Sequence, residues 1–220
     1  MATPPAIGLR ERKKQQTREH IAETARRLFS ERGFEHVTVA EVARGADVSE
    51  QTVFNYFPTK EDLVYWRLGA FEAQLLQTIR ERPPGESVLA AFRRFLLAQR
   101  GLMGEVDPEA RKQLVAITRM IAESPALRAR EQQIFAGYTA KLAQLIGGDR
   151  DDAGIEPRVA ANALMGVHRA LVDFARQRIL EGARPPRLGR EVRAQAERAF
   201  ALLEGGLGSE PITPQTAARS

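Results

Sequence analysis

The chain has 220 residues, of which 43% are hydrophobic and 28% are charged, with a formal net charge of +5. These proportions are typical of a soluble globular protein with a buried core, and they exclude a disordered or fibrous chain. No cysteine is present, which excludes disulfides, thiolate metal sites and cysteine nucleophiles.

Basic residues gather near the amino end. Before residue 19 only Glu11 opposes five cationic side chains: Arg10, Arg12, Lys13, Lys14 and Arg18. A basic segment can lie along DNA phosphates and release counterions. A short run of this kind is equally often a solvated charged tail, so both interpretations stay open. We predict a flexible basic arm over residues 1–16.

The punctuation by proline and the near absence of strand patterns predict an all-α fold. The expected helices span residues 17–32, 38–45, 49–55, 59–82, 85–103, 107–122, 125–147, 157–182 and 189–205. In the first of them, Ile21, Ala25, Leu28 and Phe29 form one apolar stripe, and Gly33 ends the helix. Residues 206–220 lack periodicity and are predicted to be a flexible tail.

Two short helices joined by a tight turn are predicted between residues 38 and 55. Thr38 and Glu41 have the spacing of a capping box at the start of the first. Asp47 occupies the turn position that needs a left-handed backbone, and Ser49 is expected to cap the second helix. This arrangement is that of a helix-turn-helix, whose second helix enters the major groove of DNA.

The second short helix has two chemically different sides. Its polar side consists of Glu50, Gln51, Thr52 and Asn55, and its apolar side of Val53, Phe54 and Phe57. Amides read adenine, a carboxylate accepts from cytosine N4, and a threonine methyl suits the thymine methyl. The flanking side chains expected to hold phosphate oxygens are Thr38, Ser49, Tyr56 and Lys60.

The string TVAEVARGADVSEQTVFNYFPTKEDLV, with the amphipathic helix before it, resembles the amino-terminal domain of TetR-family transcription regulators over about residues 17–64. The residues that carry the resemblance are Gly33-Phe34, Thr38, Val42-Ala43, Val48-Ser49, the aromatic residues Phe54, Tyr56 and Phe57, and Lys60-Glu61-Asp62-Leu63. The resemblance implies a three-helix DNA-binding domain over 17–63 and a six-helix ligand-binding and dimerisation domain over 64–205.

Three positions depart from the usual pattern of this family. Asp47 stands where glycine is common, Phe54 where tyrosine is common, and Tyr56 where histidine is common. Because Phe54 has no hydroxyl for a phosphate, we expect it to pack or to contact a thymine methyl, and we expect Tyr56 to take over the phosphate bond.

The resemblance further implies a homodimer on double-stranded DNA with an inverted-repeat operator. The expected interface is a four-helix bundle from helices 157–182 and 189–205. Its small or apolar residues are Ala160, Ala161, Ala163, Gly166 and Ala170 on the first helix, and Val192, Ala196, Ala199, Phe200 and Leu203 on the second.

A pocket for a small-molecule effector is also implied, although no motif locates it. The candidates are Trp66, Phe92, Met103, Arg119, Met120, Phe135, Tyr138, His168, Arg169 and Phe174. Ordinary core packing explains most of these side chains equally well, because stripes at helical spacing need no ligand. We expect repression that a hydrophobic or amphipathic compound relieves, with activation left open.

An enzyme is a poor alternative. The chain has three histidines, no Gly-rich phosphate loop and no paired metal-ligand motif, so we expect no catalytic residue, metal site or cofactor. A DNA-binding architectural protein without a ligand switch is the second alternative, which salt dependence and sequence preference distinguish. No apolar run of about 18 residues and no secretory signal occur, so we expect a cytoplasmic protein without a membrane partner.

Overall fold

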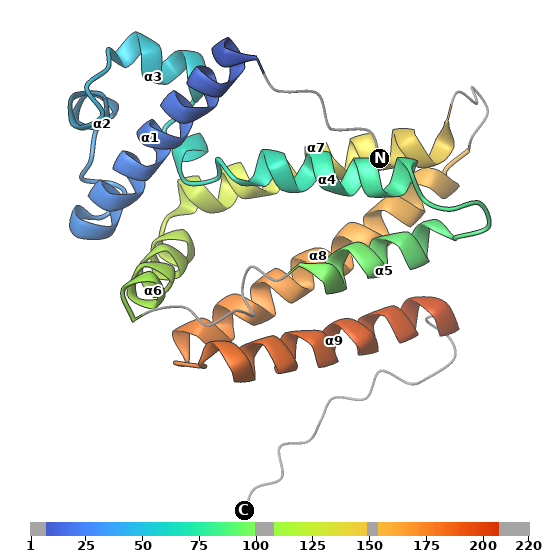
Figure 1. Ribbon diagram of the computed structural model, residues 1–220. Helices are drawn as coiled ribbons and strands as arrows, with labels where there is room; N and C mark the ends of the chain where they lie inside the picture. Colours follow the sequence, from blue (N-terminus) through green and yellow to red (C-terminus); the bar gives the residue numbers. More distant parts are fainter. Residues whose placement is uncertain (1–7, 100–107, 149–153, 207–220) are drawn as a thin grey trace, which may run out of the picture. The chain divides into compact units, whose positions relative to one another are not determined.

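The structure is a computed structural model that describes residues 8–99, 108–148 and 154–206. Throughout these ranges the ordered elements are helices, so the predicted all-α fold is confirmed (Figure 1). The helices are α1 Leu9–Arg32, α2 Val39–Gly45, α3 Glu50–Tyr56, the 3-10 helix η1 Glu61–Leu63, α4 Leu68–Arg80, α5 Val88–Ala98, α6 Pro108–Glu123, α7 Pro125–Gly147, α8 Glu156–Leu180 and α9 Pro185–Gly205.

The chain divides into two compact units. Unit 1 lies within Met1–Gln77 and Val106–Tyr138, and unit 2 within Thr78–Glu105 and Thr139–Ser220. Unit 1 therefore combines the helix-turn-helix with α6 and the first part of α7. The functional division into a DNA-binding domain over 17–63 and a regulatory domain over 64–205 stays a prediction.

The core of unit 1 is built on the predicted stripe of α1. Ile21, Ala25 and Phe29 are buried, and Leu28 packs against them. Gly33 ends the helix as predicted, with a φ of 83° that side chains rarely adopt.

Side chains from α6 and α7 complete this core and are joined to it by polar contacts. The Tyr65 hydroxyl donates to the Leu127 carbonyl at 3.0 Å, and Arg130 Nε donates to Asp62 Oδ1 at 2.8 Å. Ser124 donates to Glu35 at 2.8 Å. The loop after the helix-turn-helix is thus fastened to α7 at two points within unit 1.

The amino end of α1 differs from the prediction. The helix begins at Leu9, ahead of the expected start at residue 17, so residues 9–16 of the predicted arm are helical. The expected start depended on apolar periodicity, which this stretch lacks, but arginine, lysine, glutamine and glutamate are strong helix formers. Residues 1–7 of the arm and 207–220 of the tail lie outside the described residues.

The predicted helix over 59–82 is wrong in its first part. Thr59 and Asp62 do form reciprocal bonds, with Thr59 N donating to Asp62 Oδ2 at 3.1 Å, but the turn that they close leads only into the short η1. Leu63 and Tyr65 are both buried in the core of unit 1. Two residues apart on a continuous helix, they would face nearly opposite sides, so the chain turns before α4 begins.

Unit 2 consists mainly of α5, α8 and α9, which pack against one another (Figure 1). Helix α5 begins at Val88 rather than residue 85, because Ser87 caps it by accepting from Ala90 N at 3.1 Å. The rings of Phe92 and Phe200 meet edge to face, with centroids 6.3 Å apart.

None of the helices described has the length and hydropathy needed to cross a bilayer.

Candidate nucleic-acid interface

Helices α2 and α3 are locked into a hairpin by their turn. Asp47 has a φ of 52°, as the sequence predicts, and is the one non-glycine residue in the described ranges with a positive φ. Val48 N then donates to Ala43 O at 3.0 Å, which closes the turn. Val42 and Val53 are buried between the helices. The direction of α3 relative to α2 is therefore set by backbone geometry and small apolar contacts.

The predicted capping box at the start of α2 is confirmed. Glu41 N donates to Thr38 Oγ1 at 3.2 Å, while Thr38 N and its hydroxyl donate to Glu41 Oε2 at 2.8 and 3.0 Å. Arg32 also donates to Glu41, at 2.7 Å. These bonds, with that from the Thr38 backbone foremost, lower the pKa of Glu41 to about 2. A phosphate oxygen would have to compete with this carboxylate for the Thr38 hydroxyl proton.

The start of α3 is fixed in a similar way. Ser49 caps the helix as predicted, accepting from Thr52 N at 3.0 Å, and its hydroxyl lies 2.8 Å from that of Thr52. One turn further, Gln51 Nε2 donates to Asn55 Oδ1 at 3.1 Å. Both side-chain pairs therefore hold defined positions before any DNA is bound.

One face of α3 is open to solvent. Glu50, Gln51 and Asn55 are exposed there, whereas Val53 is buried in the core of unit 1. Phe54 lies on the open face with 43% of its surface exposed, so its predicted place on the apolar side is wrong. The reason is helical geometry. Residues 53 and 57 are one turn apart on the buried side of the helix, and position 54 lies outside that side.

Two of the predicted phosphate contacts, Tyr56 and Lys60, lie at the end of α3 and just after it in the chain. Tyr56 is half-buried against the core of unit 1. The Lys60 ammonium lies 4.2 Å from the ring centroid of Phe34 and 6.0 Å from that of Phe29. Burial lowers the pKa of Lys60, while nearby carboxylates, Glu35 first among them, oppose the shift.

The predicted effector residues are divided between the two units. Unit 1 contains Trp66, Arg119, Met120, Phe135 and Tyr138; unit 2 contains Phe92, His168, Arg169 and Phe174; and Met103 lies outside the described residues. Arg119 is exposed on α6, and Phe92 is packed in the core of unit 2 against Phe200. His168 is held neutral, because burial and the charge of Arg176 lower its pKa to about 4.

One aromatic group does assemble within unit 1. Phe135 and Tyr138 meet edge to face at 5.9 Å, and Phe71 stacks on Tyr138 at 6.3 Å. Burial, followed by the charge of Glu72, raises the pKa of Tyr138. Phe71 was not identified from the sequence, although its i, i+4 spacing with the buried Leu75 on α4 indicates the side of the helix that faces inward.

Part of the predicted dimer interface is wrong. Ala161, Ala196 and Phe200 are buried within unit 2 and face the core of their own chain. The apolar stripes of α8 and α9 pack against each other and against α5. The sequence pattern alone does not distinguish such packing within the chain from packing against a partner subunit. Among the residues described, no three histidine, aspartate or glutamate side chains gather closely enough to hold a metal ion.

The chain resembles known transcription regulators over most of its length. Residues 21–65 match the model of the bacterial regulatory proteins, tetR family. The chain is 30% identical over 176 residues to the regulator TcmR of Streptomyces glaucescens, which covers 77% of each chain. It is 47% identical over 47 residues to LuxR of Vibrio harveyi, which covers 21% of this chain and 23% of that one.

Solved structures share the fold. Native NalD, the secondary repressor of the MexAB-OprM multidrug efflux pump in Pseudomonas aeruginosa, superposes with a TM-score of 0.53 at 22% identity. The match covers 85% of this chain and 96% of NalD.

Proposed function

The chain belongs to the tetR family of bacterial regulatory proteins and is a DNA-binding transcription regulator, and from that premise we propose that α3 reads its DNA. The observation that carries this proposal is the open face of α3, on which Glu50, Gln51, Phe54 and Asn55 are exposed while the opposite side is buried in the core. A helix of this kind, fixed by its cap and turn, fits the major groove.

Each exposed side chain suits a different base edge. Gln51 and Asn55 carry amides that can read adenine, and the bond between them orients both before binding. Glu50 can accept from cytosine N4. Phe54 offers an exposed ring to a thymine methyl, and Thr52 offers its own methyl while its hydroxyl stays with Ser49.

Four flanking residues would position the helix on the phosphates. Lys60, whose ammonium lies over the Phe34 ring, would supply a cation, and Tyr56 would supply a hydroxyl. Thr38 and Ser49 already use their hydroxyls at the helix starts, so their main contribution is to hold α2 and α3 in place. A phosphate contact by the Thr38 hydroxyl would require the Glu41 carboxylate to be displaced, whereas the Ser49 hydroxyl keeps its proton for a phosphate when Thr52 donates in their shared bond.

We propose a homodimer through α8 and α9. Besides Phe54, the large apolar side chains exposed in the described ranges are Ile155, Val159 and Leu180, at 70%, 59% and 42%. At about 100° per residue they share one face of α8 with the exposed Gly166 and Ala170. A twofold interface buries such a stripe against its own copy, and it would place two α3 helices on an inverted repeat.

We further propose a repressor that a hydrophobic or amphipathic small molecule releases from DNA in the cytoplasm. The aromatic group of Phe71, Phe135 and Tyr138, in which Phe135 and Tyr138 are buried, is the apolar cluster against which such a compound would pack. Within the same unit, the Arg130–Asp62 and Tyr65–Leu127 contacts join α7 to the helix-turn-helix. Such a ligand releases DNA only if it favours a state in which the helix-turn-helix motifs of the two subunits cannot bind both half-sites at once.

Competition binding tests the DNA-reading proposal. Full-length protein is titrated with a duplex selected from a random pool and with a shuffled duplex of equal composition, at one salt concentration. Specific regulators bind their site about 10³-fold or more tightly than other DNA. Equal affinity for the two duplexes would overturn sequence reading. Release by apolar compounds is a separate assay, so its failure would leave DNA reading intact.

A further inference from the structure

We propose that the first turns of α1 form a second DNA-binding surface, which holds phosphates outside the base pairs that α3 reads. We call it the α1 basic face and define it by Arg10, Lys14 and Arg18. The proposal rests on the proposed function, because it requires α3 to lie on DNA. It assigns a role to charges that the helix-turn-helix itself does not use.

The α1 basic face follows from the early start of the helix. Because α1 is helical from Leu9, the residues at positions 10, 14 and 18 are spaced four apart and lie on one side. At about 100° per residue, Ile21 and Ala25 continue the same line. Those two residues are buried in the core that α1 shares with α2 and α3. The basic face therefore extends the side of α1 that carries the helix-turn-helix.

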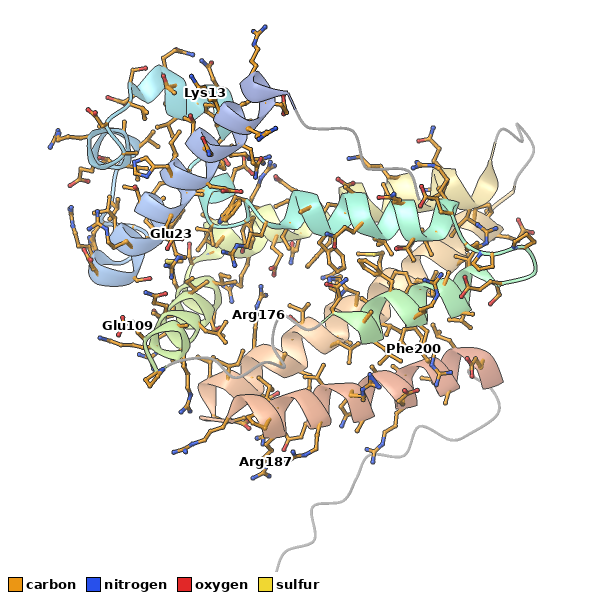
Figure 2. The ribbon with its side chains drawn as sticks, viewed as in Figure 1. Lys13, Glu23, Glu109, Arg176, Arg187 and Phe200 are labelled. Atoms are coloured by element: carbon orange, nitrogen blue, oxygen red, sulfur yellow. The ribbon has the colours of Figure 1, made fainter. Side chains whose placement is uncertain are left out.

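Arg18 joins this face to the reading helix. Its guanidinium carbon lies 5.5 Å from the ring centroid of Phe57, the residue that ends α3. Figure 1 shows the first turns of α1, in dark blue, beside the end of α3, and Figure 2 labels Lys13 on these turns. The cationic surface thus begins where the reading helix ends and is continuous with it.

The charges near the amino end of α1 are available for phosphates. Arg10, Lys13 and Lys14 are exposed, and the described part of the chain offers none of them an ion-pair partner. Farther along the helix the arginines are paired: Arg26 with Glu23, Arg27 with Glu31, and Arg32 with Glu41. Solvated, unpaired cations bind DNA by replacing its condensed counterions, and they lose no internal contact in doing so.

The composition of these turns favours DNA over a lipid surface. Residues 10–20 contain no apolar side chain, whereas a helix that lies on a membrane buries an apolar face between the headgroups. Double-stranded DNA presents regularly spaced phosphates on either side of the groove that α3 occupies. The α1 basic face would hold those phosphates without reading sequence.

A matched pair of variants tests the proposal. Lys14→Gln and Arg12→Gln each remove one positive charge from the same turns. Residues 12 and 14 lie on nearly opposite sides of the helix, so only Lys14 belongs to the basic face. The affinity of the full-length protein for its selected duplex is measured across a salt series. Circular dichroism of both variants checks that the helices are retained.

We expect Lys14→Gln to reduce the salt slope of a dimer by about 2, since each lost phosphate contact per subunit removes about 0.9. The double variant Arg10→Gln/Lys14→Gln should reduce it by about 3 to 4. Arg12→Gln should change it by less than half as much, and all variants should select the same DNA sequence. Equal slopes for Lys14→Gln and Arg12→Gln would overturn the α1 basic face. If the wild-type protein shows no preference for the selected duplex over other DNA, the proposed function itself is overturned.

Discussion

The Thr38 hydroxyl accepts a hydrogen bond from Glu41 N at 3.2 Å and donates one to the Glu41 carboxylate at 3.0 Å. The residue that the sequence suggests as a phosphate contact is therefore first of all a structural cap. It fixes the start of α2, on which α3 is mounted through the turn at Asp47. Changes at this cap should act on stability before they act on DNA binding.

Thr38→Val should lower the free energy of unfolding by about 0.5 to 2 kcal/mol, because it removes the cap while keeping the shape of the side chain. Thr38→Ser, which keeps the hydroxyl, is the matched control and should lose much less. Urea unfolding followed by circular dichroism measures both. If Thr38→Val is as stable as wild type, the bonds at this cap contribute nothing.

The Glu41 carboxyl should make stability depend on pH. Its pKa falls from the ordinary 4.5 to about 2 in the folded protein, so the unfolded chain takes up the proton first as the pH drops. The stabilisation is complete above pH 4.5 and is lost between pH 4.5 and 2. Glu41→Gln should be less stable than wild type at neutral pH, and the difference should shrink across this window. A difference that stays constant would contradict the assigned pKa.

Replacing Gln51 and Thr52 together with alanine should relax base preference. Each lost base contact removes about 1 to 3 kcal/mol of discrimination, so the ratio of specific to random affinity should fall at least tenfold. Gln132→Ala, at an exposed glutamine of α7, is the control and should keep the full ratio. A double variant that keeps its preference for the selected duplex would show that α3 is not the reading helix.

Phe54 should contact the methyl group of thymine, since 43% of the surface of Phe54 is exposed on the reading face. Replacing thymine by uracil removes only that methyl. Wild-type protein should lose affinity for the uracil duplex at one or more positions, whereas Phe54→Ala should bind both duplexes equally. Phe54→Tyr keeps the ring and should retain the discrimination. The same loss in wild type and Phe54→Ala would exclude a methyl contact by this ring.

Lys60→Ala should weaken binding to all sequences alike. A dimer would lose two phosphate contacts, which should reduce the salt slope by about 2. The variant should also lose about 0.5 to 1 kcal/mol of stability, because the ammonium no longer lies over Phe34. Salt titrations on selected and shuffled duplexes measure the first effect. An unchanged slope would leave Lys60 with only its packing role.

Features set by neighbouring residues were predictable from the sequence. The cap at Ser49, the left-handed Asp47 and the end of α1 at Gly33 each depend on the chemistry of one or two residues within a single turn. Helix α7 could likewise be bounded by Pro125 and Gly147. Such signals do not depend on how the rest of the chain packs.

Features set by distant contacts were not predictable. The chain turns after η1 because Leu63 and Tyr65 are both drawn into a core completed by Leu127, far along the sequence. Phe54 is aromatic yet exposed, because the core is already filled by Val53. The apolar stripe containing Phe200 faces its own chain, and no local pattern distinguishes that from a partner-facing stripe.

The central claim is that the α3 helices of two subunits read an inverted repeat. Selection of bound duplexes from a random pool by the full-length protein tests it most directly. We predict that the selected sequences contain two copies of one half-site in inverted order, with centres separated by about one helical turn or a little more. A pool that stays random, or one enriched only in a single unrepeated motif, would contradict the account.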